Sequence, residues 1–260
     1  MLSNKTFIIA FLLTSATFFS FSRLNSYPLN AVKKVVIDAG HGGKDPGTGN
    51  GREKRFALDI ALRLGKMIKN NLKDVDVIYT RDTDVFIPLN ERAEIANKNK
   101  ADLFISIHCN AFTSANASGT ETYVMGLHKS EDNLNLAKRE NNVILMEDNY
   151  KKSYKGFNPN SPLAHIMLAN YQSAFMNQSM DFASRVERQF VNHGNKSRGV
   201  KQAGFLVIWE TTMPSVLIET GYLSNPTDAR KLASESGREN IAKAIYTAFN
   251  SYKSDVERNQ

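Results

Sequence analysis

The fold of this chain is decided by the stretch Lys34-Val35-Val36-Ile37-Asp38-Ala39-Gly40-His41-Gly42-Gly43. Its first half is a short apolar run, which predicts a buried strand. Its second half is rich in glycine, which predicts a loop directly after that strand. Apolar residues then recur at intervals of three and four, which predicts an amphipathic helix. They are Ala57, Ile60, Ala61, Leu64, Ile68 and Leu72.

The same alternation of strand and helix continues along the chain. Short apolar runs predict further strands at residues 75–79, 103–107, 120–124 and 215–219. Helices are predicted from Pro88 to Ala96, over residues 168–190, and at the C-terminus around residues 241–252. This order favours a single α/β domain with a mostly parallel central sheet flanked by helices. Ligands of such sheets bind beyond the carboxyl ends of the strands, so polar residues there are the candidates for function.

Composition narrows the class of partner. The chain has 260 residues with 42% hydrophobic and 23% charged residues, which is ordinary for a soluble globular domain. A net charge of +7 favours anionic partners such as cell-wall polymer, membrane surface or nucleic acid. The basic residues are spread along the chain and no nucleic-acid motif is present, so nucleic acid is not an expected partner.

The N-terminus is predicted to carry an export signal. Residues 7–21 form an apolar run behind Lys5, interrupted only by Thr and Ser. This run is shorter than the roughly 20 residues that a membrane span needs, so residues 1–26 are predicted to be a signal peptide. An uncleaved membrane anchor is the alternative. The protein is therefore expected to be exported to the periplasm or cell envelope.

Histidine and glutamate follow the predicted strands in a pattern that suits a metal. His41 and His108 each come directly after an apolar strand, and Glu53 opens the first helix. Two imidazoles and a carboxylate are a known ligand set for catalytic zinc, with a fourth position open for water. The alternatives are hydrogen-bonded structural histidines and a glutamate that only suits the helix dipole.

Glu219 ends the predicted strand at residues 215–219, where a charged side chain is costly unless it has a partner. A zinc hydrolase needs a base that takes a proton from the attacking water and returns it to the leaving amine. Glu219 suits that role. No HExxH motif is present, which excludes the usual metalloprotease arrangement.

A series of motifs adds a resemblance to a known family. They are VIDAGHGGKDPG (36–47), GREK (51–54), TRDTD (80–84), LNER (89–92), ADLFISIHCNA (101–111), SRGVKQAGF (197–205) and PSVLIETGYLSN (214–225). In this order they resemble the zinc-dependent N-acetylmuramoyl-L-alanine amidases of the amidase-3, AmiC-like family. Cys109 departs from the family, where alanine is common, and is expected to be a small buried hydrophobe.

The resemblance implies a catalytic domain over residues 32–255 that acts on peptidoglycan. It would cut the amide between the lactyl group of N-acetylmuramic acid and L-alanine, in cell-wall remodelling or daughter-cell separation. The implied site is one Zn²⁺ per chain held by His41, Glu53 and His108, with Glu219 as the catalytic base. Asp38 and Asn110 are candidates for substrate or supporting contacts, and hydrogen bonding at strand ends is the alternative for both.

Residues 127–170 are polar and irregular and are predicted to be an inserted segment. In the AmiC-like subgroup such an insertion carries a helix that covers the zinc and supplies an inhibitory glutamate. A helix is predicted over residues 130–148, and Glu140 and Glu147 fall within its apolar face. Glu140 is predicted to occupy the vacant zinc position in a closed state, with Glu147 as second choice. Both could instead be solvated helix glutamates.

A closed state implies an activator protein that binds the insertion and shifts the population towards the open state. Its predicted landing site is residues 144–146 or 166–168, which are apolar. Two other classes of function compete with the amidase. One is a wall-binding protein without turnover, and the other is a zinc peptidase that acts on stem peptides. Oligomeric state cannot be read from the sequence.

Overall fold

The computed structural model describes residues 31–169 and 174–258, and the predicted signal peptide lies outside them. Its strands are β1 (Lys34–Ala39), β2 (Asp76–Tyr79), β3 (Leu103–Asn110), β4 (Thr120–Met125), β5 (Ser197–Ala203) and β6 (Ser215–Tyr222). Its helices are α2 (Arg52–Asn71), α3 (Leu89–Lys98), α4 (Glu131–Asn141), η1 (Asn142–Met146), α5 (Tyr150–Ser153), α6 (Pro162–Ala169), α7 (Met176–Asn192), η2 (Leu206–Ile208), α8 (Pro226–Ala233) and α9 (Glu235–Arg258). No helix in the described ranges has both the length and the apolar character of a membrane span.

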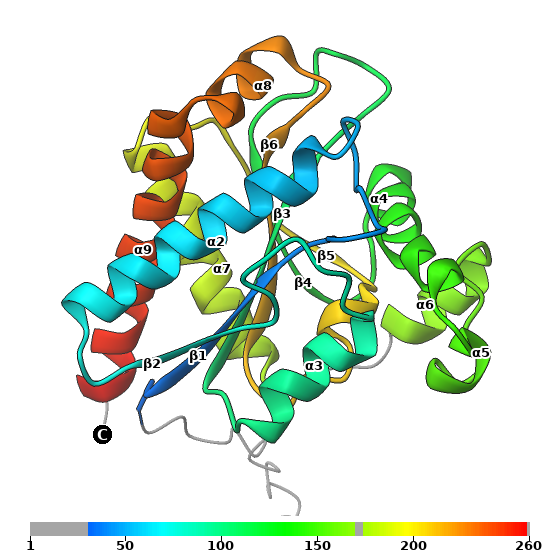
Figure 1. The fold of residues 1–260 in the computed structure, drawn as a ribbon, viewed down its shortest axis with the longest axis horizontal. Coiled ribbons are helices and arrows are strands. Elements are labelled where there is room, and N and C mark those ends of the chain that lie inside the picture. Colours follow the sequence, from blue (N-terminus) through cyan, green and yellow to red (C-terminus); the bar gives the residue numbers. More distant parts are fainter. Residues whose placement is uncertain (1–30, 170–173, 259–260) are drawn as a thin grey trace, which may run out of the picture.

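The strands form one sheet in the order β2-β1-β3-β6-β4-β5. Neighbouring strands pair in parallel except for β4 and β6, which are antiparallel. Helices cover both faces of this sheet (Figure 1). The predicted α/β domain with a mostly parallel sheet is therefore confirmed.

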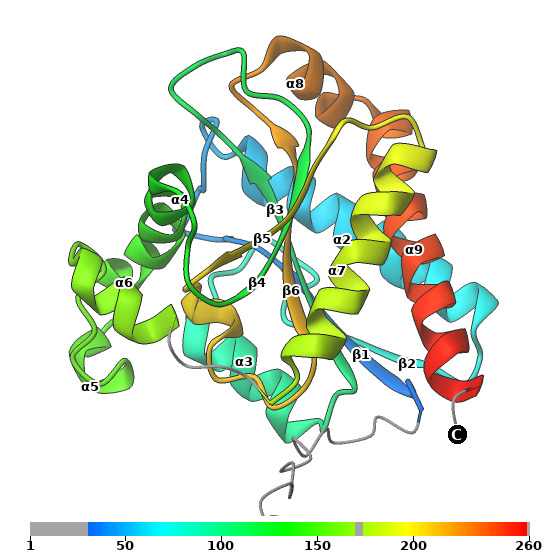
Figure 2. The ribbon, with the colours of Figure 1, turned by 180° about the vertical axis from the view of Figure 1, so that it is seen from behind.

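The two faces of the sheet have separate cores. Helices α2, α7 and α9 cover one face, where Ile105 and Val216 are fully buried, and Figure 2 shows α7 and α9 side by side. Helix α3, η2 and the inserted segment cover the other face, where Phe104 and Leu217 are buried. Successive side chains of a strand alternate between faces. His108 of β3 therefore lies on the face of Phe104, towards the insertion.

The inserted segment differs from its prediction. The helix expected over residues 130–148 ends at Asn141 and continues as the short 3₁₀ helix η1. The Asn141 side chain accepts a hydrogen bond from Leu206 N at 2.9 Å and donates one to Gly204 O at 2.8 Å. Asn141 therefore ties the end of α4 to the loop after β5, and this contact was not visible from periodicity.

Two other predictions differ from the structure. The helix expected over residues 168–190 was wrong at its start, because α7 begins at Met176 and residue 168 belongs to α6. Strand β5 and helix α8 were not predicted at all. Most side chains of β5 are half-buried and polar, as suits the edge of a sheet, so this strand lacks the apolar alternation that identifies others.

Candidate metal centre

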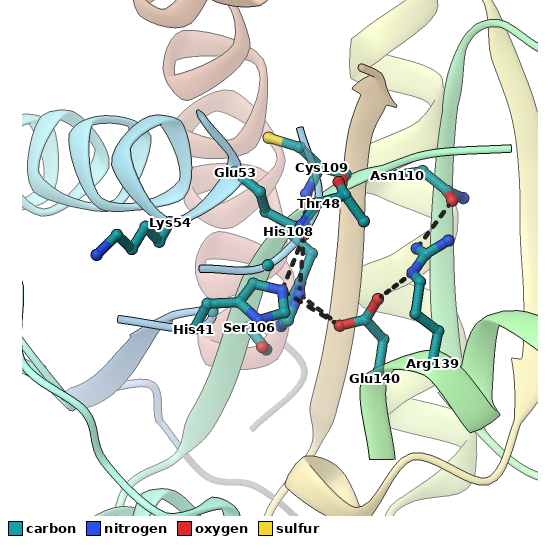
Figure 3. Close-up of polar contacts among 12 residues, drawn as sticks. His41, Thr48, Glu53, Lys54, Ser106, His108, Cys109, Asn110, Arg139 and Glu140 are labelled. Carbon is teal, nitrogen blue, oxygen red and sulfur yellow. Dashed lines mark hydrogen bonds and ion pairs between the residues drawn. The ribbon is translucent and has the colours of Figure 1, made fainter. Parts of the chain in front are cut away.

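Four buried side chains from distant parts of the chain converge above the sheet. His41 lies in the loop after β1, Glu53 in the first turn of α2, His108 near the end of β3, and Glu140 in the last turn of α4 (Figure 3). Their ligand atoms all lie within 4.8 Å of one another. The fold thus brings together the three predicted zinc ligands and the predicted gating glutamate.

The backbone of the glycine-rich loop after β1 packs closely against the His108 ring of this centre. A Cβ atom added to Gly40 would lie 2.4 Å from the imidazole of His108, so only glycine leaves room for that ring. His41 itself has a left-handed backbone with a φ of 60°. This turn carries the chain from β1 towards α2, and Glu53 Oε2 accepts a hydrogen bond from Thr48 N at 2.7 Å. The motif that suggested a loop therefore also sets the positions of the ligands.

Hydrogen bonds orient the candidate ligands towards one point. The Nδ1 atom of His41 lies 2.7 Å from Asp45 Oδ2, which leaves its Nε2 facing the centre. Metal-binding histidines usually donate their other ring N–H to a carboxylate or carbonyl in this way. Glu53 Oε1 accepts from Cys109 N at 3.0 Å. Burial alone would raise the pKa of Glu53, but attraction from His41 lowers it below its usual range.

The donor set fits a zinc ion. Glu140 Oε2 lies 3.3 Å from both His41 Nε2 and His108 Nδ1. None of these three buried atoms makes a hydrogen bond within the described residues. Unpaired buried polar atoms are rare in native proteins and need an explanation. A cation shared by two imidazoles and two carboxylates explains all of them, and nitrogen and oxygen ligands in fourfold coordination suit zinc.

Glu219 lies beside these residues in the sheet. In the register of the strands it pairs directly with His108 on β3 and with Glu121 on β4. Its side chain is fully buried, and neither carboxylate oxygen has a hydrogen-bond partner in the described part of the chain. Burial raises the pKa of Glu219 well above its usual range, and repulsion from Glu140 adds to this effect.

Asp38 stabilises the loop after β1 through a chain of hydrogen bonds. It accepts hydrogen bonds from Ser106 Oγ at 2.6 Å and from Arg92 Nη1 at 2.8 Å. Arg92 in turn donates to the carbonyl oxygen of His41 at 2.8 Å. Burial disfavours the charged form of Asp38, but attraction from Arg92 holds its pKa below the usual range. Asp38 therefore acts on the centre through Arg92 and has no exposed surface.

Asn110 occupies a different position, at the edge of a cavity of about 530 Å³. Its Oδ1 accepts from Arg139 Nη2 at 3.1 Å, and its Nδ2 donates to Glu121 Oε2 at 3.3 Å. Arg139 also donates to Ala111 O at 2.7 Å and to Glu140 Oε1 at 3.0 Å. Arg139 therefore lies between the cavity and the metal centre and contacts both.

Glu147, the second candidate gate, does not reach the centre. It accepts hydrogen bonds from Tyr154 Oη at 2.7 Å and from Leu89 N at 3.1 Å. Because α4 ends at Asn141, the helical spacing that aligned Glu147 with Glu140 does not extend to it.

Several contacting residues were missed from the sequence. Asp45 had the clearest signal, because it is an acidic residue four positions after His41 within the same glycine-rich motif. Arg139 lies next to Glu140 and could have been noticed as its partner. Glu121 lies in a predicted strand, and only the pairing of β4 with β6 brings it to the site.

Comparisons with known proteins identify the family to which the chain belongs. The family described as N-acetylmuramoyl-L-alanine amidase matches residues 35–251. N-acetylmuramoyl-L-alanine amidase AmiA of Escherichia coli K12 is 32% identical over 224 residues, which are 84% of this chain and 75% of AmiA. The crystal structure of an N-acetylmuramoyl-L-alanine amidase from Clostridium difficile 630 aligns with a TM-score of 0.62 and 29% identity, over 86% of this chain and 97% of that one.

A second solved structure is the CwlD amidase from Clostridioides difficile in complex with the GerS lipoprotein. It aligns with a TM-score of 0.62 and 25% identity, over 86% of this chain and 99% of CwlD. The family match covers nearly all of the domain that contains the metal centre. The chain therefore belongs to the N-acetylmuramoyl-L-alanine amidases, enzymes that hydrolyse the amide between N-acetylmuramic acid and L-alanine in peptidoglycan.

Proposed function

We propose that this protein is an exported, zinc-dependent amidase that is held inactive by its own insertion. Residues 1–26 are its signal peptide, residues 32–255 its catalytic domain, and residues 127–170 its regulatory segment. The proposed zinc ligands are His41, Glu53 and His108. The observation that carries the proposal is the convergence of these side chains with Glu140, because their buried ligand atoms need a shared cation.

The chemistry divides between the ion and the protein. A bound zinc ion supplies Lewis-acid polarisation of the amide carbonyl and acidifies a water molecule. Glu219 accepts a proton from the attacking water at a carboxylate oxygen. As the bond between the lactyl carbonyl carbon and the L-alanine nitrogen breaks, Glu219 returns that proton to the leaving amine. The products are the muramic lactyl carboxylate and a stem peptide with a free N-terminus.

Glu140 closes the centre in this proposal. Its Oε2 lies 3.3 Å from both imidazoles, where a substrate carbonyl would need to enter. Arg139 supports this position, because it contacts both Glu140 and the backbone after β3. Hydrolysis therefore requires α4 to move, and a ligand that binds the open form better shifts the population towards it.

An activator protein fits the exposed part of the insertion. Leu145 is 48% and Met146 46% exposed, and Met167 is 67% exposed. Ile144 and Leu168, which were expected to share this surface, are buried instead because they pack in the core between the insertion and the sheet. CwlD is solved in complex with a lipoprotein, so a lipoprotein or another envelope protein is a reasonable kind of partner.

The competing functions have less support. A wall-binding protein without turnover would have no need for a buried carboxylate such as Glu219 beside the centre. A zinc peptidase acting on stem peptides shares the same donor set, but the family match favours the sugar–peptide bond. A product assay separates these two activities. Free muramic lactyl carboxylate with an intact stem peptide identifies the amidase.

The deciding experiment combines zinc content with release of dye from labelled peptidoglycan. The mature protein is compared with Glu219→Gln and Glu140→Ala, and Glu131→Ala, an exposed glutamate on the same helix, is the control. We expect one zinc per chain in all four proteins. We expect release to fall by roughly 100-fold or more in Glu219→Gln, the usual range for a lost general base, and to rise in Glu140→Ala.

Other results would contradict separate parts of the proposal. Full activity in Glu219→Gln would show that Glu219 is not the base. Unchanged or lower release by folded Glu140→Ala would show that Glu140 does not block the centre. Dye release by protein that contains no zinc would contradict a zinc-dependent mechanism.

A further inference from the structure

We propose that the cavity beside the metal centre binds a carboxylate of the stem peptide through Lys201 and Arg198. This inference rests on the proposed function, because it assigns the peptide side of the same substrate. The cavity measures about 530 Å³ and lies between α4 and the ends of β4, β5 and β6. Its lining includes Glu121, Tyr123, Arg139, Arg198, Lys201 and Tyr222.

The sheet connects this cavity to the reacting centre. His108, Glu219 and Glu121 pair in register on three adjacent strands, so their side chains form one row on the same face. Neighbouring strands lie about 4.8 Å apart, which puts Glu121 roughly 10 Å along the row from His108. An extended peptide advances about 3.4 Å per residue. The second or third residue of a stem peptide that starts at the centre would therefore lie in the cavity.

Glu121 organises the positive charge of the cavity. Its buried carboxylate accepts from Lys201 Nζ at 2.5 Å, from Tyr222 Oη at 2.8 Å and from Arg198 Nε. One carboxylate thus anchors two cations, and a positive charge remains. The Lys201 and Arg198 side chains are 22% and 32% exposed, so both are accessible from the cavity.

Aromatic rings hold these cations in place. Arg198 lies over the Tyr222 ring at 5.4 Å, and Lys201 lies 5.9 Å from the centre of the Tyr123 ring. Such cation–π contacts restrict long side chains before any ligand arrives. A pre-organised pair of cations binds an anion with a smaller loss of side-chain freedom than two mobile surface residues would.

The charge of the cavity indicates which part of the substrate enters. Its charged lining consists of three cations, Arg139, Arg198 and Lys201, and two carboxylates, Glu121 and Asp132. The N-acetylated sugars of the glycan are uncharged, whereas the stem peptide carries free carboxylates. Arg139 is paired with Glu140, but Lys201 and Arg198 share the single carboxylate of Glu121, and this local excess of positive charge suits the peptide. A carboxylate that accepts from both Lys201 and Arg198 would make charge-assisted hydrogen bonds, which are stronger than neutral ones.

Binding of product peptides tests this inference without depending on turnover. The mature protein is titrated calorimetrically with the dipeptide L-Ala–D-Glu and with its bis-carboxamide. We expect the dipeptide to bind roughly tenfold tighter or more, as hydrogen bonds to a charged group imply. Lys201→Met should lose most of this preference and Lys201→Arg should restore it. Glu121 keeps Arg198 as a partner in both variants, and Lys243→Met, an exposed lysine on α9, is the control.

Equal affinity for the two probes, or no measurable binding of either, would overturn the inference. So would a Lys201→Met protein that binds like Lys243→Met. Dye release from labelled peptidoglycan by the same preparations separates the two proposals. Dye release without a preference for the carboxylate supports the amidase proposal and contradicts carboxylate binding in the cavity. If the protein prefers the carboxylate but releases no dye, even as Glu140→Ala, the result supports carboxylate binding in the cavity and contradicts the proposed amidase activity.

Discussion

Glu140 Oε2 lies 3.3 Å from Nδ1 of His108, although the two residues belong to a helix of the insertion and to a central strand. The contact places Glu140 in the same buried cluster as His41, Glu53 and His108. The insertion is thus part of the centre in this conformation, and each residue that holds α4 in place becomes a residue that limits access.

Arg139 is one of the residues that hold α4 in place. Arg139→Ala removes hydrogen bonds to Ala111 O and Glu140 Oε1 and leaves α4 less firmly attached. Because hydrogen bonds to charged groups contribute about 1.5–3 kcal/mol, the open population should rise roughly tenfold or more. Release from labelled peptidoglycan and amide exchange in α4 should both increase. Lys138→Ala on the same helix is the control, and equal behaviour of the two variants would contradict the role of Arg139.

Asp45 should tune the affinity for zinc. Asp45→Asn weakens the hydrogen bond that orients His41, because the amide is neutral and carries one acceptor oxygen. Loss of such a supporting contact typically lowers metal affinity by about 10–100-fold. Competition with a chromogenic chelator measures the change directly. Asp82→Asn, an exposed residue outside the centre, should match the wild type. An unchanged affinity in Asp45→Asn would show that His41 needs no orienting partner.

Asp38 should matter for stability more than for chemistry. Asp38→Asn removes the charge that pairs with Arg92, and both side chains are almost completely buried. Breaking a buried pair usually costs about 3–5 kcal/mol of unfolding free energy, because the remaining charge has no compensation. Urea denaturation of the zinc-loaded protein measures this loss. A variant within about 0.5 kcal/mol of the wild type, the range of neutral surface changes, would contradict this role.

Gly40 should be intolerant of any side chain. Gly40→Ala puts a Cβ atom 2.4 Å from the His108 ring, which is closer than real contacts allow. The imidazole must then move, so zinc affinity should fall well before the fold is lost. Zinc content and circular dichroism on the same sample separate the two effects. A variant that keeps its fold and binds zinc like the wild type would show that the ring can relocate without cost.

Chelation should lower thermal stability. The centre brings Glu53 and Glu140 together with two imidazoles in a buried site, and a bound cation stabilises only the folded chain. A chelator should therefore reduce the melting temperature, and added zinc should restore it. The size of the shift should grow with zinc concentration. A melting temperature that ignores both treatments would argue against a metal at this position.

Local sequence patterns predicted the parts of the site that lie close to strand ends. The run from Val35 to Gly43 has both the apolar strand and the glycine-rich loop, so the sequence alone was enough to place His41 at a strand end. His108 and Glu219 follow comparable apolar runs. Their mutual alignment depends on strand order, which periodicity does not contain.

The parts that could not be predicted depend on long-range contacts. Strand β5 is polar because it lies at the sheet edge, so its sequence looks like a loop. Glu121 and Arg198 meet only because β4 pairs in parallel with β5, a strand that lies far from it in the chain. The end of α4 is set by Asn141 and its contacts beyond β5, more than 60 residues away in the chain. In each case a tertiary partner, not a local preference, decides the outcome.

The contacts of Asn141 limit how the centre can open. Glu140 is the neighbour of Asn141, so a rigid swing of α4 about that fixed end would move the carboxylate very little. Under the proposed gating, a movement of α4 that carries Glu140 away from the imidazoles breaks the hydrogen bonds between Asn141 and Gly204 O and Leu206 N. Opening then requires the end of α4 to detach from the loop after β5, and a hinge motion about that end is not enough. If the proposed gating holds, amide exchange at Leu206, which lies outside the insertion, reports how often the centre opens.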